Sequence, residues 1–542
     1  MPIIRTDLWA SGKYSKQEDD WIYNALDCCV TLECWEEMGK LPLPSQVTYD
    51  FERGMQAPVL RMMQRGWLID QSERANAAHV LEVLIEQAQA LLNRLAHAVW
   101  GKDLNPKSPL QLQQFFYGAM RLPEQWVSKK GVKKLSTDRD TLEEKLDVYL
   151  LARPFISLIL TIRDLSKQLE VFKTSMDSDG RMRCSYNIAG TDTGRLSSSA
   201  SSTGTGRNLQ NIAPLLRRMF IADPGWKLCG IDLEQAESRE VGWLCGTILG
   251  DWSYLDACLS GDLHTLTCKL IWTDLPWTGD PKHDRQIADQ LFYREFSYRD
   301  LSKRGGHGSN YYGTPFTMAR HLKVPVSLME NFQRNYFGGF PGIPLWHQYV
   351  ASTIQRTQKL SNSFGRERYF LGRTNDDTTL RAAIAYVPQS NTAERMNCSI
   401  WRLWEKYDQI DYRRPGLPLP VHSGTDLALR QGDSPRPWDK GRIQILHQEH
   451  DAVYFLYREE DEQEIIPLAL KEIALEIRDP KSGRSLIVPG EAKVGWNRGN
   501  FASQEDKDAG KVKRTNLLGL KKLKAGTRDD RVLLPLLERI QE

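Results

Sequence analysis

Two stretches of the chain predict how its central sheet is built: WKLCGID at residues 226–232 and IQILHQEHDAVYFLY at residues 443–457. The first is a short apolar run that ends in Asp232, which is typical of a buried strand. The second has two apolar runs around a polar tip with Asp451, which predicts a β-hairpin. If the fold brings the two acids together, they can hold a pair of Mg²⁺ ions, because magnesium prefers hard oxygen ligands. Taken singly, an acid at a strand end is more often a turn or cap residue.

A second signal is the stretch RDLSKRGGHGSNY at residues 299–311. Four of its side chains follow one another at steps of four residues, which places them on one face of a helix: Arg299, Lys303, His307 and Tyr311. Two cations, an imidazole and an aromatic ring suit a triphosphate and the base attached to it. The alternative is a solvated basic face. The glycines at 305, 306 and 308 each cost about 1 kcal/mol in a helix, so we expect that something approaches its backbone closely or that the helix bends.

Apolar periodicity predicts further helices at residues 49–100, 142–176, 285–311 and 379–405. Residues 191–206 are rich in Ser, Thr and Gly and predict a loop, and residues 413–440 predict a surface insertion. The chain has 542 residues, of which 41% are hydrophobic and 26% charged. This balance excludes a disordered or fibrous protein, and the length allows about three or four folded units.

Composition also limits the partners and the compartment. The 72 Lys and Arg residues against 69 Asp and Glu residues give a net charge of +3, which is too small to prove a polyanionic partner. No apolar run is long enough to span a membrane, and the first residues lack the apolar stretch of a signal peptide. The nine Cys residues form no CxxC pair. We therefore expect no disulfide framework, no structural zinc and a cytoplasmic location.

In their order along the chain these motifs resemble those of family A DNA polymerases, the group of bacterial DNA polymerase I and many phage replicative enzymes. The resemblance covers about residues 46–498. It implies an α+β fold shaped like a right hand, with a palm built on an antiparallel sheet, helical fingers and a helical thumb. The implied thumb is 46–180, the palm 181–250 and 375–498, and the fingers 251–374. Residues 1–45 would be a remnant of a 3′→5′ exonuclease-like region, and 499–542 a basic C-terminal tail.

The resemblance also assigns the reactive residues. Residues 232–239 resemble motif A, in which Asp232 and the Leu233 carbonyl bind both metals and Glu237 excludes a ribose 2′-OH. His450-Asp451 resembles motif C, with Asp451 as the second metal ligand. Residues 299–311 resemble motif B of the fingers. The residues implied to bind the dNTP are Glu237, His264, Arg299, Lys303, His307 and Tyr311, with Lys303 as a proton donor to pyrophosphate and Tyr311 beside the templating base.

Contacts to primer–template DNA are implied on both sides of the site. They come from the TGRLSS and NLQNI segments, the palm helix, motif C and a thumb lysine cluster: Arg195, Gln210, Asn211, Arg381, Gln389, His450, Lys129, Lys130, Lys133 and Lys134. Gln210 and Asn211 have the alternative of satisfying loop backbone, and His264 that of a capping or core histidine. The basic residues between 511 and 528 bind DNA, bind a replisome partner, or form a solvated tail.

Four residues depart from the family pattern. Ala452 replaces the acid that usually follows His-Asp, and His307 stands where Phe or Tyr is usual. Tyr312 stands where Gly usually follows the motif B tyrosine, and Ala385 replaces a common Asn on the palm helix. We expect an altered rate or metal response from the first and the loss of one DNA contact from the last.

The implied function is template-directed DNA synthesis from dNTPs with two Mg²⁺ ions, or Mn²⁺ in their place, in DNA replication of a phage. The alternatives are a single-subunit RNA polymerase, a repair or lesion-bypass polymerase, and a non-catalytic DNA-binding protein. Tyr23 and Asp27 resemble the last motif of the proofreading exonuclease, but only 22 residues precede Tyr23. We therefore expect no exonuclease activity from this chain alone and a helical remnant that packs on the palm. Either the chain is truncated or the nuclease is a separate polypeptide, so a separate exonuclease or replisome subunit is a candidate partner.

Overall fold

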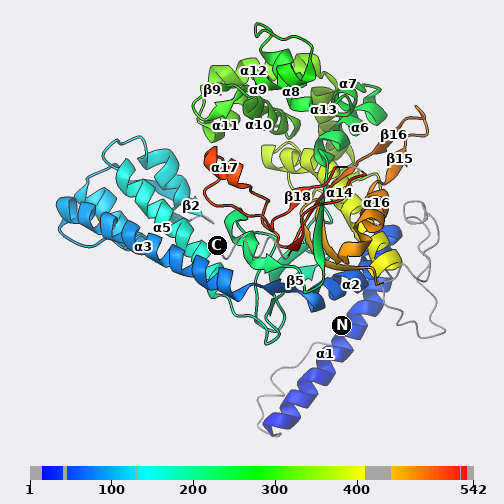
Figure 1. Ribbon diagram of the computed structural model, residues 1–542, viewed down its shortest axis with the longest axis horizontal. Helices are drawn as coiled ribbons and strands as arrows, with labels where there is room; N and C mark the ends of the chain where they lie inside the picture. Colours follow the sequence, from blue (N-terminus) through cyan, green and yellow to red (C-terminus); the bar gives the residue numbers. More distant parts are fainter. Residues whose placement is uncertain (1–14, 41–44, 130–131, 409–440, 525, 534–542) are drawn as a thin grey trace.

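The structure is a computed structural model that describes residues 15–40, 45–129, 132–408, 441–524 and 526–533. Figure 1 shows a sheet with its helices, a helical group above it, and two long helices side by side at the left. Each of the three regions has its own hydrophobic core. The α+β right-hand fold is thereby confirmed, and we call the regions palm, fingers and thumb. The insertion predicted at 413–440 and Lys130 lie outside the described residues.

The palm is built on a five-stranded antiparallel sheet in the order β13-β14-β8-β17-β18. The predicted strand and hairpin both form, and their residues are buried along most of their length. One edge of the sheet comes from the predicted C-terminal tail, so this part of the tail belongs to the palm. The strands are β8 (Lys227–Leu233), β13 (Ile443–Glu449), β14 (Ala452–Tyr457), β17 (Gly490–Gly495) and β18 (Lys521–Lys522).

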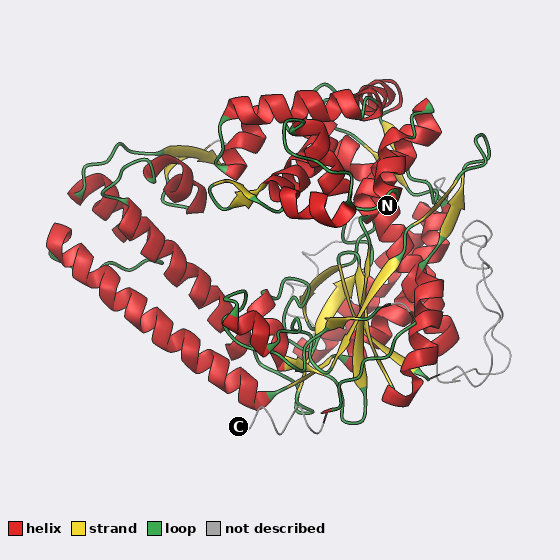
Figure 2. Ribbon diagram, turned by 45° about the horizontal axis from the view of Figure 1, so that its top comes forward, coloured by secondary structure: helices red, strands yellow, loops and turns green. Residues whose placement is uncertain are grey.

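Helices pack on this sheet, and the longest confirms the helix predicted at 379–405. Figure 2 shows the palm strands in yellow between these helices and the long helices of the thumb. The palm helices are α2 (Gln46–Arg65), α6 (Ala236–Leu249), α14 (Asp377–Leu403) and α16 (Glu462–Ile473), with a π-helix at Trp404–Asp408. Short strands complete the region: β1 (Trp67–Ile69), β4 (Arg181–Met182), β5 (Cys184–Asn187), β6 (Ser197–Ala200), β7 (Phe220–Ile221), β15 (Glu476–Arg478) and β16 (Ser485–Ile487). The predicted loop at 191–206 therefore contains a strand, β6.

The single helix predicted at 49–100 is wrong. It is divided into α2 and α3 (Gln71–Trp100) by β1, which pairs with β4 and β7. Gly66 ends α2 with a φ of 62°, a conformation that favours glycine, and a Cβ there would lie 2.5 Å from the Arg183 side chain. Pairing with distant strands thus outweighs the helical pattern of the local sequence.

The helix predicted at 285–311 is also divided. Its parts are α9 (Pro281–Ala288), a hairpin of β9 (Leu291–Tyr293) and β10 (Phe296–Ser297), and α10 (Tyr298–Asn310). Ser297 and Asp300 form a capping box that starts α10, the helix with the motif B residues. The remaining elements of the fingers are α7 (Ser253–Leu259), α8 (Leu263–Ile271), α11 (Pro315–Leu322), α12 (Val326–Gly339), α13 (Gly342–Thr357), β11 (Lys359–Ser361) and β12 (Glu367–Tyr369).

The thumb consists of α3 packed along α5 (Arg153–Lys173), with shorter elements at its far end. The helix predicted at 142–176 is therefore a π-helix at Thr141–Leu146 followed by α5. The shorter elements are α4 (Pro109–Gln113), a π-helix at Gln114–Ala119, β2 (Trp126–Lys129) and β3 (Val132–Leu135). The predicted lysine cluster lies on this β2–β3 hairpin, where Lys133 and Lys134 are exposed and Lys129 ends β2.

The N-terminal helix α1 (Lys16–Gly39) contains Tyr23 and Asp27 and has no buried residue. It projects from the lower end of the molecule in Figure 1. The prediction that this helix packs on the palm is therefore wrong. Among the described helices, α1 included, none is both long and apolar enough to cross a membrane.

Candidate active site

The two predicted metal ligands meet at one edge of the palm sheet. Asp232 lies near the end of β8, and Asp451 lies in the two-residue turn between β13 and β14. His450 adopts the left-handed conformation that such a turn requires, with a φ of 53°. The antiparallel register sets Ala452 opposite Asp232, and the Leu233 N–H donates to the Asp451 carbonyl oxygen at 3.0 Å. Register and turn geometry therefore bring together two acids that are 219 positions apart in the sequence.

Burial and nearby negative charge raise the energy of the ionised form of both acids. Burial, and after it the charge of Asp451, raises the pKa of Asp232 to about 6. Burial also raises the pKa of Asp451, and the charge of Glu237 adds to this effect. Within the described ranges neither acid has a cationic side chain within ion-pair distance. The pair therefore has unbalanced negative charge that a bound cation would stabilise.

A cavity of about 430 Å³ opens in front of these acids. The palm contributes Asp232, Asp451 and Glu237 to its lining, and the fingers contribute the other side. Lys303 and His307, one helical turn apart on α10, both line it, as does His264 at the start of α8. The cavity thus places carboxylates opposite an ammonium group, as phosphoryl transfer to a nucleotide requires.

The cavity also fits divalent cations by its donor chemistry. Besides the two carboxylates, it is lined by Gln235, whose buried Oε1 has no hydrogen-bond partner among the described residues. No described group of three or more His, Cys, Asp or Glu side chains is arranged to hold a metal by itself. Magnesium commonly binds through one or two carboxylates and completes its shell with water and substrate phosphates. Asp232, Asp451 and the Leu233 carbonyl therefore suit Mg²⁺ better than a metal that needs an all-protein shell.

Arg299 does not line the cavity in this structure. Its guanidinium forms a two-pronged pair with Asp262, from Nε to Oδ2 at 3.0 Å and from Nη2 to Oδ1 at 2.9 Å. Asp262 also caps α8 and accepts from Arg285 at 3.0 Å. Burial opposes ionisation of Asp262, but the bonds from Arg299 and Thr265 outweigh it and hold its pKa below the usual range. Asp262 holds two of the five N–H donors of this guanidinium, so a triphosphate at Arg299 would compete with Asp262 for those two donors.

His264 lines the cavity but carries no charge at neutral pH. Burial, and after it the charge of Arg299, lowers the pKa of His264 to about 4. In the protein alone His264 therefore adds no positive charge to the cavity. A neutral imidazole can still donate one hydrogen bond to a phosphate oxygen. His264 is not the capping residue of α8, because Asp262 is. It is not a core residue either, because its imidazole is only half-buried.

Glu237, the predicted steric gate, is held by two other predicted site residues. The Tyr311 hydroxyl donates to Glu237 Oε2 at 2.5 Å, and Arg195 forms an ion pair with Oε1. The ring of His307 packs edge-to-face on Tyr311 with centroids 4.9 Å apart. Burial, and after it the charge of Glu237, holds the pKa of Tyr311 well above its usual value. These contacts link the TGRLSS segment, motif A and motif B beside the cavity.

The close approach expected at the glycines of α10 is confirmed, and it comes from within the protein. A Cβ on Gly305 would lie 2.7 Å from the Phe332 ring, and one on Gly308 would lie 2.6 Å from the Met318 sulfur. The close approach is therefore made by α12 and α11 of the protein itself. Gly306 is the exception, because it also lines the cavity.

The predicted DNA contacts are spread over the palm and thumb. Gln210 is buried, and its amide donates to the carbonyl oxygens of Leu196 and Gln448. It therefore satisfies loop backbone, which is the alternative to a DNA contact. Asn211 is exposed beside it. On α14, Arg381 is half-exposed near Asp377, and Gln389 is partly buried two turns further along. His450 is exposed next to Asp451.

Sequence reasoning missed the residue that joins α10 to the rest of the fingers. Asn310 is buried, donates to the Tyr254 hydroxyl at 2.8 Å and accepts from the Tyr336 hydroxyl at 2.9 Å. His347 bonds its carbonyl oxygen at 2.9 Å. Its neighbours Ser309 and Tyr311 are not apolar, so no local pattern marked this role. The departure at Tyr312 is explained in part, since it adopts a φ of 62°, where glycine is favoured, and its ring packs against His347.

Comparison with known proteins agrees with this geometry. Residues 76–496 match the sequence profile of DNA polymerase family A. The chain is 27% identical over 391 residues to the thermostable DNA polymerase I of Thermus aquaticus, an alignment that covers 69% of this chain and 42% of that enzyme. It is 28% identical over 352 residues to DNA polymerase I of Helicobacter pylori, which covers 62% and 35%. The chain thus spans less than half the length of these relatives.

Among solved structures, the chain is similar to the POL domain of Pol1 from M. smegmatis, solved in complex with DNA primer-template and dNTP. The TM-score is 0.61 at 23% identity, and the alignment covers 82% of this chain and 69% of the other. This likeness supports the fold. The profile match spans well over half of the sequence and includes the three motifs at the cavity. The chain therefore belongs to DNA polymerase family A.

Proposed function

We propose that the chain is a DNA-directed DNA polymerase that adds dNTPs to the 3′-OH of a primer, in DNA replication in the cytoplasm. The observation that carries the proposal is the cavity in which Asp232 and Asp451 face Lys303. Carboxylates alone suit many metal sites, and a lysine alone suits many anions. The combination across one cavity suits a metal-bound triphosphate.

Asp232, Asp451 and the Leu233 carbonyl would hold two Mg²⁺ ions, with Mn²⁺ as a substitute. When bound, such ions lower the pKa of the primer hydroxyl and stabilise the charge of the leaving pyrophosphate. Lys303 donates to the phosphate oxygens, neutralises part of their charge and can supply the proton that pyrophosphate takes up. His264 donates one neutral hydrogen bond. Arg299 would join them through the donors that Asp262 does not hold, or in exchange for Asp262.

Selection of deoxynucleotides would depend on Glu237. Tyr311 and Arg195 hold its carboxylate in one position, so its place beside the cavity does not depend on the substrate. A side chain fixed in this way excludes a 2′-hydroxyl by occupying its space. This favours a DNA polymerase over the RNA polymerase alternative.

The DNA would lie against the palm and be held by the thumb. Phosphate contacts from Lys133 and Lys134 on the β2–β3 hairpin do not depend on sequence. Arg195, Arg381, Gln389 and His450 are the proposed contacts on the palm side. A separate exonuclease or replisome subunit stays a prediction.

The test is primer extension on a primed DNA template with Mg²⁺, with dNTPs and then with rNTPs, for the wild type and Asp451→Asn. We expect extension with dNTPs only, and a loss of at least about 1,000-fold in the variant. Binding of primer–template should change less than about twofold. The matched control is Asp274→Asn, an exposed acid of the fingers. Extension by Asp451→Asn at a near-normal rate would refute the assignment, and incorporation of rNTPs at equal rates would favour the RNA polymerase.

A further inference from the structure

Asp232 has an ionisable neighbour on one side of its strand and none on the other. In the register of the sheet it faces Ala452 of β14 and Glu491 of β17. Residues directly opposite in an antiparallel pair project to the same face, with Cβ atoms about 4.5–5.5 Å apart. Glu491 is therefore a third carboxylate beside the proposed metal ligands, on the side away from Asp451.

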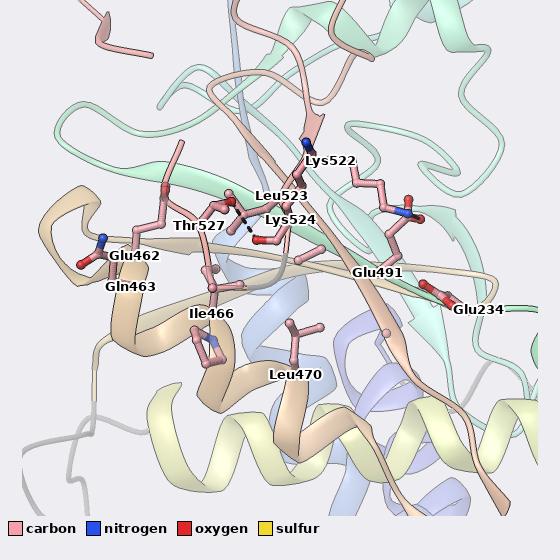
Figure 3. A pocket seen from close by; sticks show the side chains of 14 residues that line it. Glu234, Glu462, Gln463, Ile466, Leu470, Glu491, Lys522, Leu523, Lys524 and Thr527 are labelled. Atoms are coloured by element: carbon pink, nitrogen blue, oxygen red, sulfur yellow. Dashed lines mark hydrogen bonds and ion pairs between the residues drawn. The ribbon is translucent and has the colours of Figure 1, made fainter. Parts of the chain in front are cut away.

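Two lysines hold Glu491. Lys493, two residues further along β17, lies 3.4 Å from Oε1, and Lys522 of β18 forms an ion pair with Oε2. Lys522 is paired in register with Lys493, so all of these side chains project from the same face of the sheet as Asp232. In Figure 3, Lys522 points toward Glu491, and Glu234 lies beside Glu491. This group is at one end of a cavity of about 580 Å³ whose lining also includes Ile466 and Leu470.

The strand that supplies Lys522 is anchored firmly to the palm. Downstream of it, Asp529 forms an ion pair with buried Lys227 at 3.1 Å, and its N–H donates to Glu462 at 2.7 Å. Arg531 donates to the Val494 carbonyl oxygen at 2.7 Å. Lys522 therefore has a defined position, although it belongs to the segment that was predicted to be a basic C-terminal tail.

We propose that Glu491 is a positioning residue for Asp232, and that Lys522 holds the Glu491 carboxylate in place and balances part of its charge. The inference rests on the proposed function. Glu491 adds negative potential beside Asp232, which favours cations at the Asp232–Asp451 pair. Lys522 and Lys493 balance part of that charge. In this way the C-terminal strand contributes to the active site of the polymerase, although none of its residues lines the cavity in front of Asp232.

The test uses the full chain without DNA or nucleotide and measures binding of Mn²⁺ by electron paramagnetic resonance. Glu491→Gln leaves the lysines unbalanced and should weaken binding about fivefold, whereas Lys522→Met leaves Glu491 unbalanced and should strengthen it about threefold. The Mn²⁺ affinity of the double variant should lie between those of the two single variants. Lys521→Met is the matched control, because Lys521 pairs with Val494 and projects from the other face. It should not change the affinity.

Opposite signs for the two single variants would support the proposal, since loss of structure would weaken binding in both. A second readout is primer extension, in which Glu491→Gln should lower kcat about tenfold with the KM for dNTP changed less than twofold, and Glu491→Asp should restore part of kcat. Equal Mn²⁺ affinity in all variants, or a parallel loss of affinity and melting temperature, would overturn it. Asp232→Ala separates the two hypotheses: if wild-type binding survives that change, the proposed metal site itself is wrong, and this inference falls with it.

Discussion

The palm and the fingers present their charged groups to the cavity in opposite ways. On the palm, Asp232 and Asp451 lie close together, and neither has a cationic side chain within ion-pair distance in the described chain. On the fingers, Arg299 is already paired with Asp262 and held away from the cavity, and Lys303 alone faces it. The palm is therefore arranged to receive cations. The fingers would have to exchange an internal partner for a phosphate before they bind with full charge.

The two cores differ as well. Buried ion pairs cross the palm, among them Arg395 with Glu240 at 2.5 Å and Lys227 with Glu462 at 2.7 Å. The fingers core contains a group of aromatic rings in stacked and edge-to-face contacts, such as Phe332 on Tyr336. Ion pairs of this kind have one favourable geometry, whereas apolar contacts tolerate small shifts. The palm core is therefore held in part by directional charge contacts, and the fingers core in part by aromatic packing.

The largest effect should come from breaking the palm core. Lys227 is 0% exposed and balances two acids that are also buried, Glu462 and Asp529. Lys227→Met leaves Glu462 without a counter-charge and Asp529 with Arg531 alone, and should lower the free energy of unfolding by about 3–5 kcal/mol. Urea denaturation measures this. Lys173→Met in the thumb breaks an exposed pair with Glu82 and should change stability by less than about 1 kcal/mol; equal effects would contradict the role of the buried network.

Next comes the one fingers cation that faces the cavity. Lys303→Met should lower kcat about 100- to 1,000-fold, because a positioned donor to developing charge is lost. Single-nucleotide incorporation at saturating dNTP measures it. Arg304→Met is the control, since Arg304 follows on the same helix but packs over the Phe296 ring. A change in KM alone, with kcat intact, would show that Lys303 only binds the ground state.

A smaller effect distinguishes two adjacent glycines of α10. Gly305→Ala forces a Cβ to 2.7 Å from Phe332 and should destabilise the protein by about 1–3 kcal/mol. Gly306→Ala meets Tyr336 at 3.3 Å and should cost less. Thermal unfolding compares the two variants. If Gly306→Ala were the more damaging to stability, the packing of α12 against α10 would not be the reason for these glycines.

The smallest effect should follow release of Arg299. Asp262→Asn keeps a residue type that caps helices well but removes the charge that holds Arg299. We expect the KM for dNTP to fall about threefold, because the guanidinium no longer has to leave a carboxylate. Steady-state extension at varied dNTP concentration measures this. A rise in KM would mean that Asp262 orients Arg299 for the triphosphate, and the palm–fingers contrast would then need revision.

The local sequence pattern predicted secondary structure correctly where the element depends only on neighbouring residues. The hairpin at 443–457 and helix α14 formed as predicted, since period-two and helical spacing are properties of neighbouring residues. The pattern failed at β1, whose Leu68 pairs with Arg181 and Ile221. It also failed to show the pairing of Arg299 with Asp262, which lies 37 positions earlier on another helix. Partners at such separations leave no periodic signal.

The sequence by itself determined the motifs, the residue types at the cavity and the strands that carry the acids, because these depend on short-range spacing. Only the tertiary structure decided which charges are paired: Arg299 is held by Asp262, whereas Asp232 and Asp451 form no ion pair among the described residues. It also decided that Lys521–Lys522 is a palm strand. Those outcomes depend on which surfaces are buried together and on the pairing energies of distant groups, and both arise only when the whole chain is packed.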